Sequence, residues 1–110
     1  NVLETLINSI GIENFSAASV LFETELEQRV NALKSAWVRR DIELVLKEAH
    51  TLKSSAASFG AIAFSQEMSN LEEASRRGDV SVLIDYLPQI DQRVAELLAA
   101  YQAQVASLCE

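Results

Sequence analysis

Apolar residues recur at spacings of three and four along most of the chain, which is the period of an amphipathic helix. A short apolar segment over residues 2–10 ends at Gly11, and Asn14 is a candidate N-cap for the next helix. That helix is long, and its apolar face consists of Phe15, Ser19, Phe22, Leu26, Val30, Leu33 and Trp37. No segment of useful length alternates with period two, so the pattern predicts an all-α fold.

Two further helices follow the first long one. Asp41 interrupts the apolar pattern and can cap the second, which stops at Gly60. The basic residues of the last turn and the glycine after it, at 76–78, mark the end of the third. The apolar positions of the two helices are Ile42, Val45, Ala49, Leu52, Ala56 and Phe59, then Ala61, Phe64, Met68 and Leu71.

The last region keeps strict spacings of four and three over residues 83–101, which is typical of a bundle helix. Pro88 interrupts it, so we expect either a kink or a short helix 80–86 followed by a longer one. Four long apolar faces joined by short connections bury one another best in an antiparallel up-down-up-down four-helix bundle. The segment 2–10 adds a short extra N-terminal helix.

Composition fits one soluble domain over residues 1–110, with 49% hydrophobic residues and a net charge of −7. The acidic balance argues against binding to nucleic acid or to an anionic membrane surface. Cys109 is the only cysteine, so no internal disulfide can form and a reducing, cytoplasmic location fits. Because the chain starts at Asn1 rather than Met, it is either a domain of a longer protein or a chain that has lost its start.

The stretch 50–61 differs from the rest of the chain, because it combines the only histidine, His50, with a run of small residues. On a helix, His50 falls opposite the buried face, together with Glu43, Leu46, Lys47, Lys53, Ser54 and Ala57. Serine is a costly choice inside a helix. Small residues beside an exposed imidazole therefore indicate that another surface comes close there.

The string His50-x-Leu-Lys-Ser-Ser-Ala-Ala-x-Phe-Gly-Ala61 resembles the signature of histidine phosphotransfer (HPt) domains, the phosphohistidine carriers of multistep phosphorelays. It is similar to quorum-sensing phosphorelay carriers and to the C-terminal HPt modules of hybrid sensor kinases. Ser54 stands where many members have glycine. The helix order around the motif also matches the family.

The resemblance implies that His50 accepts a phosphoryl group from an aspartyl phosphate of a response-regulator receiver domain and passes it to another receiver. It also implies that Lys53 stabilises the phosphoryl oxygens and that Glu72, on the next helix, orients the imidazole ring. The expected docking surface comprises Leu46, Lys47, Ser54, Ala57, Gly60 and Phe64, with Ile62 as a further candidate.

The sequence lacks a nucleotide-binding glycine-rich loop and an acidic triad for Mg²⁺, so the domain is not expected to phosphorylate itself from ATP. We expect no cofactor on this chain and Mg²⁺ on the receiver partner. His50 with Glu43 or Glu72 gives too few ligands for a zinc site. The domain can be free-standing, or fused to or paired with a hybrid sensor kinase.

Two other interpretations remain. The first is the dimerisation region of a sensor kinase, but that family has an acidic residue directly after its histidine, where this chain has Thr51, and it must dimerise, whereas we expect a monomer. The second is a non-catalytic scaffold or interaction bundle with an incidental surface histidine. In that case Glu72 and Lys53 are ordinary solvated side chains.

Overall fold

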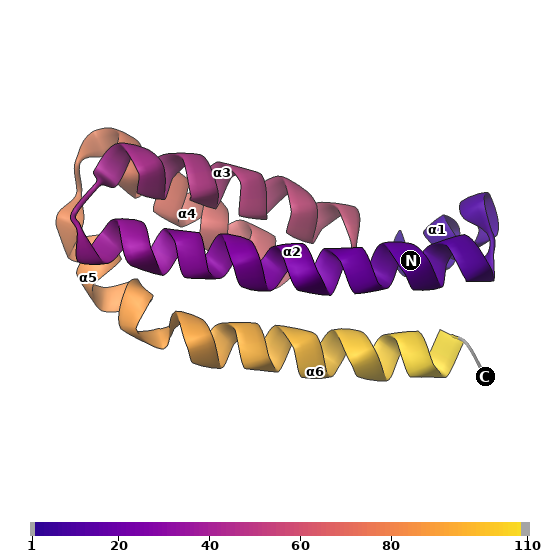
Figure 1. Cartoon of the computed structure of the whole chain (residues 1–110). Helices are drawn as coiled ribbons and strands as arrows, with labels where there is room; N and C mark the ends of the chain where they lie inside the picture. The colour runs from indigo at the N-terminus through magenta and orange to yellow at the C-terminus, as the bar shows by residue number, and fades with distance from the viewer. Residues whose placement is uncertain (1, 109–110) are drawn as a thin grey trace.

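The computed structural model describes residues 2–108, and that part of the chain contains helices and the turns between them, without a strand (Figure 1). The predicted all-α fold is confirmed. Cys109 lies outside the described residues. The elements are α1 (Val2–Ile10), α2 (Ile12–Val38), α3 (Ile42–Ser58), α4 (Ile62–Arg77), α5 (Val80–Tyr86), a 3₁₀ turn (Leu87–Gln89) and α6 (Ile90–Leu108).

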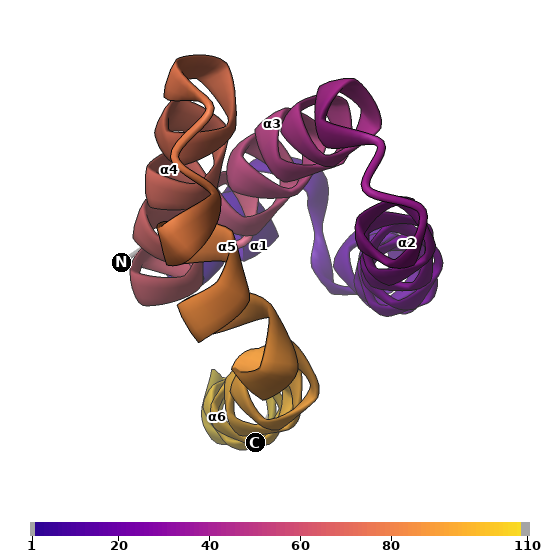
Figure 2. The same cartoon turned by 90° about the vertical axis from the view of Figure 1, so that its left-hand side faces the viewer.

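The four long helices α2, α3, α4 and α6 form an elongated bundle. In Figure 1, α2 and α4 run toward the end where α3 begins, and α3 and α6 run the opposite way. The bundle measures 44 × 22 × 20 Å, and its long dimension follows from α2, whose 27 residues span about 40 Å at 1.5 Å per residue. Seen along the bundle in Figure 2, α3 lies between α2 and α4.

Local sequence signals set some of the helix ends. The Asp41 carboxylate accepts a hydrogen bond from the Leu44 amide at 3.2 Å, so the predicted N-cap is confirmed. The predicted cap at Asn14 is wrong, because α2 already begins at Ile12 and the Asn14 amide donates instead to the Ile10 carbonyl at 2.8 Å. Gly11 adopts a φ of +83°, which lets the chain reverse direction and restart a helix without a side-chain cap.

The proline near the C-terminal region separates two helices. Pro88 lies in the 3₁₀ turn between α5 and α6, so the prediction of a short helix over 80–86 is confirmed. Proline is tolerated there because the first residues of a helix have no intrahelical acceptor for their N–H groups.

The core consists of the predicted apolar faces, whose apolar members are all buried or half-buried. Phe22 stacks on Phe59 with ring centroids 4.5 Å apart, and the Tyr101 ring lies 5.2 Å from Phe22. These three rings join α2, the end of α3 and α6. Tight packing on the inner side of α3 fixes which of its residues face outward.

Candidate functional site

His50 lies on the outward face of α3. Its sequence neighbours Ala49 and Leu52 are buried on the inner face of the same helix. Its side chain is 59% exposed, so the predicted accessibility of the imidazole is confirmed. A ring in this position can be reached by a partner without any change in the bundle.

The imidazole is hydrogen-bonded to Glu72, a residue of α4. Glu72 Oε2 lies 2.7 Å from His50 Nδ1, and the Glu72 side chain is only 6% exposed. An ionised carboxylate can only accept hydrogen bonds, so Nδ1 carries the ring proton. The lone pair of the neutral ring is therefore on Nε2.

Two cations complete the surroundings of Glu72. Lys53 Nζ lies 2.5 Å from Oε1, and Arg76 Nη2 lies 3.1 Å from Oε2. The pKa of Glu72 is lowered from 4.5 to about 2, chiefly by the hydrogen bond from Lys53; burial opposes this, and the hydrogen bond from His50 adds to the lowering. Glu72 is thus a buried anion at neutral pH.

The structure adds two residues, Arg76 and Ser65, and the contact between Lys53 and Glu72, none of which the sequence analysis found. Arg76 was interpreted only as a helix C-terminal signal, although its position four residues after Glu72 is the spacing of an ion pair on a helix. Lys53 was expected to be available to a phosphoryl group, but here it is bound to Glu72. The Ser65 hydroxyl also donates to the Lys53 carbonyl at 2.8 Å, which ties α4 to α3 beside the site.

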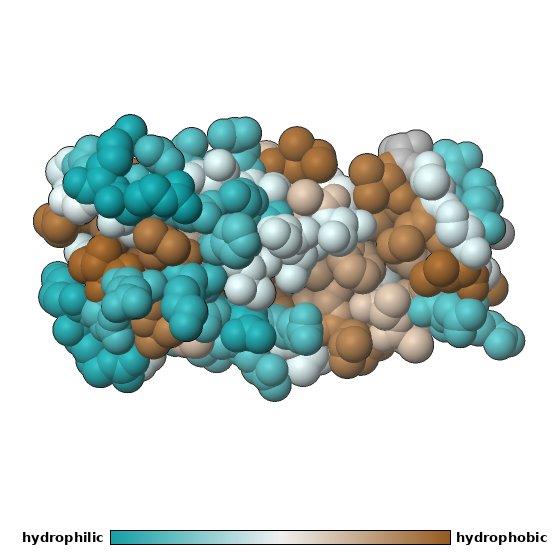
Figure 3. All heavy atoms as spheres, turned by 90° about the horizontal axis from the view of Figure 1, so that it is seen from above, coloured by the Kyte–Doolittle hydropathy of each residue, from teal (hydrophilic) through white to brown (hydrophobic). Residues whose placement is uncertain are grey.

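The surface around His50 has little bulk. Lys47, Ser54 and Ala57 are exposed and Leu46 is half-buried, while the Ser54 hydroxyl points back to the His50 carbonyl at 3.4 Å. Figure 3 views the bundle from above α3 and shows hydrophilic residues over the end where α2 turns into α3, with apolar residues gathered toward α1. The exposed imidazole thus has two small side chains, Ser54 and Ala57, beside it on its own helix face.

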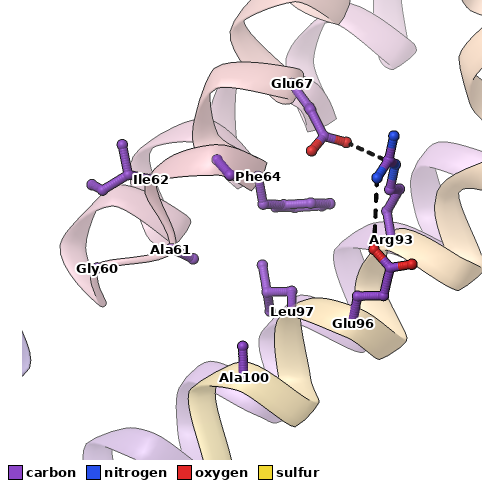
Figure 4. Close-up of a pocket in the computed structure, with 10 residues that line it drawn as sticks. Gly60, Ala61, Ile62, Phe64, Glu67, Arg93, Glu96, Leu97 and Ala100 are labelled. Carbon is purple, nitrogen blue, oxygen red and sulfur yellow. Dashed lines mark ion pairs between the residues drawn. The ribbon is translucent and has the colours of Figure 1, made fainter. Parts of the chain in front are cut away.

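The prediction that Phe64 belongs to an exposed docking surface is wrong. Its ring is 3% exposed because it points from α4 toward α6, where Leu97 lies opposite (Figure 4). Gly60 is half-buried, and Ile62 is 60% exposed. All three line a separate open cavity of about 410 Å³, at whose edge Arg93 pairs with Glu67 and Glu96.

Residues 2–108 lack the features of two other classes of protein. No group of three or more His, Cys, Asp and Glu side chains in this range could hold a metal ion. No helix in the same range is long and apolar enough to cross a bilayer.

Comparison with known proteins identifies the family. Residues 19–100 match the sequence model of the Hpt domain. The phosphorelay protein LuxU of Vibrio vulnificus strain YJ016 is 31% identical over 97 residues, which cover 82% of this chain and 84% of that protein, and LuxU of strain CMCP6 matches equally well. In fold, the chain is similar to the crystal structure of histidine-containing phosphotransfer protein B (HptB) from Pseudomonas aeruginosa PAO1, with a TM-score of 0.87, 21% identity, and coverage of 96% of this chain and 91% of that one. The family predicted from the motif around His50 is confirmed, and the chain belongs to the Hpt domain family.

Proposed function

We propose that this domain is a phosphohistidine carrier in which His50 accepts a phosphoryl group from an aspartyl phosphate of a receiver domain and passes it to another receiver. The observation that carries the proposal is the exposed imidazole whose Nδ1 is hydrogen-bonded to the buried anion Glu72. This arrangement leaves one defined nitrogen, Nε2, as the nucleophile.

The chemistry follows from the position of that proton. The Nε2 lone pair forms a bond to phosphorus, the bond between phosphorus and the aspartate oxygen breaks, and its electron pair leaves on the carboxylate. The ring becomes positively charged as Nε2 bonds to phosphorus. Glu72 stabilises this charge through the Nδ1 hydrogen bond, and it is already in place before the reaction. Transfer to the next aspartate is the same step in reverse.

Lys53 is the candidate for contact with the phosphoryl oxygens. Its side chain is one-third exposed and starts one helical turn after His50, and its ammonium could turn from Glu72 toward a group on Nε2. A cation at that position would offset the charge on the transferred oxygens.

The receiver would supply Mg²⁺ and the acidic residues that bind it, and this chain would supply the nucleophile and the docking surface around Leu46, Lys47, Ser54 and Ala57. As a carrier, the domain would have no autokinase activity and would bind no cofactor of its own. Its monomeric state and cytoplasmic location remain predictions, as does its link to a hybrid sensor kinase.

The test uses a panel of purified receiver domains loaded with acetyl phosphate. The wild-type chain should take up acid-labile, base-stable phosphate from at least one of them, and His50→Gln should take up none while melting at the same temperature. Phosphate uptake by His50→Gln would refute the assignment of the histidine. A wild-type chain that accepts phosphate from no receiver and from no small phosphoryl donor would favour the scaffold interpretation.

A further inference from the structure

Glu72 has two cationic neighbours, although one would balance its charge. Lys53 binds Oε1, and Arg76 binds Oε2, the same oxygen that holds His50 Nδ1. The two cations are held differently. Arg76 lies on the same helix as Glu72 and also donates to Glu73 Oε2 at 3.0 Å, whereas Lys53 reaches across from α3.

The proposed function creates a problem at Glu72. When Lys53 turns to the phosphoryl group, the carboxylate loses the contact on Oε1. If the imidazole were then its only remaining side-chain partner, the buried carboxylate would lack the hydrogen bonds that offset its burial, so it would rotate toward water or take up a proton. Either response would weaken the hydrogen bond to Nδ1 at the moment when the ring becomes cationic.

We propose, resting on the function above, that Arg76 is a positioning residue that keeps Glu72 Oε2 on His50 Nδ1 while Lys53 is bound to the phosphoryl group. Arg76 can do this because its planar guanidinium donates to two carboxylates at once, which fixes its orientation. In the free domain both cations hold Glu72. In the phosphorylated domain Glu72 keeps Arg76 and the cationic ring of His50 as its partners, and Lys53 has left it.

The competing explanation is a plain surface ion pair. Arg76 is 56% exposed and lies four residues after Glu72, and such pairs contribute little to stability. The chain offers a matched control, because Arg77 is also exposed and basic, and its side chain makes no hydrogen bond or ion pair within the described range 2–108.

The test compares wild type, Arg76→Gln, Arg76→Lys and the control Arg77→Gln in the full chain. The phosphoryl donor is phosphoramidate, which needs no docking protein. Nε2 bonds to phosphorus, the phosphorus–nitrogen bond of the donor breaks, and ammonia leaves. The readouts are the uptake rate, the ¹⁵N and Hδ1 NMR signals of His50 before and after phosphorylation, and a thermal melt.

We expect Arg76→Gln to lower the uptake rate about three- to tenfold. The variant removes the charge-assisted hydrogen bond from Arg76 to Glu72, and this weakens the hydrogen bond between Glu72 and His50 Nδ1. Its Hδ1 signal should persist in the free domain, where Lys53 still holds Glu72, and should be lost after phosphorylation. Arg76→Lys should recover most of the rate, and Arg77→Gln should match wild type.

Two results overturn the inference. One is an Arg76→Gln variant that matches Arg77→Gln in both rate and Hδ1 signal, and the other is an Hδ1 signal lost equally in the free and phosphorylated domain. Either result leaves the proposed function intact as long as wild type takes up phosphate on His50. A wild-type chain that takes up none refutes the proposed function itself.

Discussion

Within residues 2–108 two glutamates are buried, Glu48 where α3 faces α2 and Glu72 where α4 faces α3, and their surroundings differ. Both oxygens of Glu72 are bonded, to an imidazole and two cations. Glu48 has one distant partner, Arg29, at 3.4 Å from Oε1, and its Oε2 has no hydrogen-bond partner within residues 2–108.

The comparison shows that burial of a carboxylate does not by itself mark a functional site. Glu48 loses contact with water and gains little, because Arg29 is half-exposed and its distance is long for a strong hydrogen bond. Glu72 is also buried, but three donors converge on it, and one of them is the imidazole that we propose as the nucleophile. The number and kind of groups that a buried charge orients are the better guide to function.

The largest effect on stability is expected from a change in the apolar core, at neither of the two glutamates. Leu52 on α3 is 1% exposed, so Leu52→Ala should lower the free energy of unfolding by about 2–5 kcal/mol. Urea denaturation measures this, with the exposed Val20→Ala as the control. Folded Leu52→Ala molecules should still take up phosphate, which would separate stability from activity. A loss no larger than that of Val20→Ala would mean that the inner face of α3 is misassigned.

The two glutamates should differ most in phosphoryl transfer. Glu72→Ala removes the acceptor of the Nδ1 proton, so uptake from phosphoramidate should fall about 10- to 100-fold. Glu48→Ala should stay within about twofold of wild type. Equal losses in the two variants would show that a general effect of core packing, rather than orientation of the ring, controls the rate.

A smaller effect concerns pH. The pKa of Glu72 is lowered to about 2 in the folded domain from an ordinary value of 4.5, mainly by Lys53. The unfolded chain therefore binds this proton first, so Glu72 stabilises the fold fully above pH 4.5 and loses that contribution as the pH falls toward 2. Urea midpoints between pH 2 and 5 should fall less steeply for Glu72→Gln than for wild type. The control variant Glu48→Gln keeps Glu72, so its urea midpoints should fall with pH as steeply as those of wild type. Midpoints that fall equally steeply for Glu72→Gln and wild type would contradict this account.

The smallest effect is expected at the poorly satisfied glutamate. Replacement of a buried ion pair by an apolar residue is often neutral or stabilising, so Glu48→Leu should change the free energy of unfolding by about 1 kcal/mol or less, in either direction. Its phosphate uptake should equal that of wild type. A large destabilisation would show that Arg29 and Glu48 contribute more than their separation indicates.

Much of the fold follows from local signals, because the spacing of apolar residues reports which face of each helix is buried. The helix start at Asp41 and the break at Pro88 have equally local causes. The predicted N-cap at Asn14 is wrong because α2 begins after Gly11, whose conformation lets the helix start without a side-chain cap. The exposure of His50 also follows from periodicity, whereas the resemblance to a family, not the pattern, pointed to Glu72.

The remaining features of the site depend on how helices approach one another. The pairing of Lys53 with Glu72 joins α3 to α4, and no spacing within one helix encodes it. Phe64 fitted both an apolar face and a docking surface in the sequence, and only the position of α6 decides between them. Arg76 was within reach of sequence analysis, because its spacing from Glu72 is a local signal.

The turn between α3 and α4 has a consequence for the dynamics of the N-terminal helix. Gly60 adopts a φ of +81°, and a Cβ placed on it would lie 3.4 Å from the Cβ of Val2 and 3.9 Å from Leu3. The side chains of α1 therefore cover the one residue of this turn that needs a left-handed backbone. Opening of the turn uncovers α1 and undocking of α1 exposes the turn, so their amides should exchange with deuterium as a single cooperative unit.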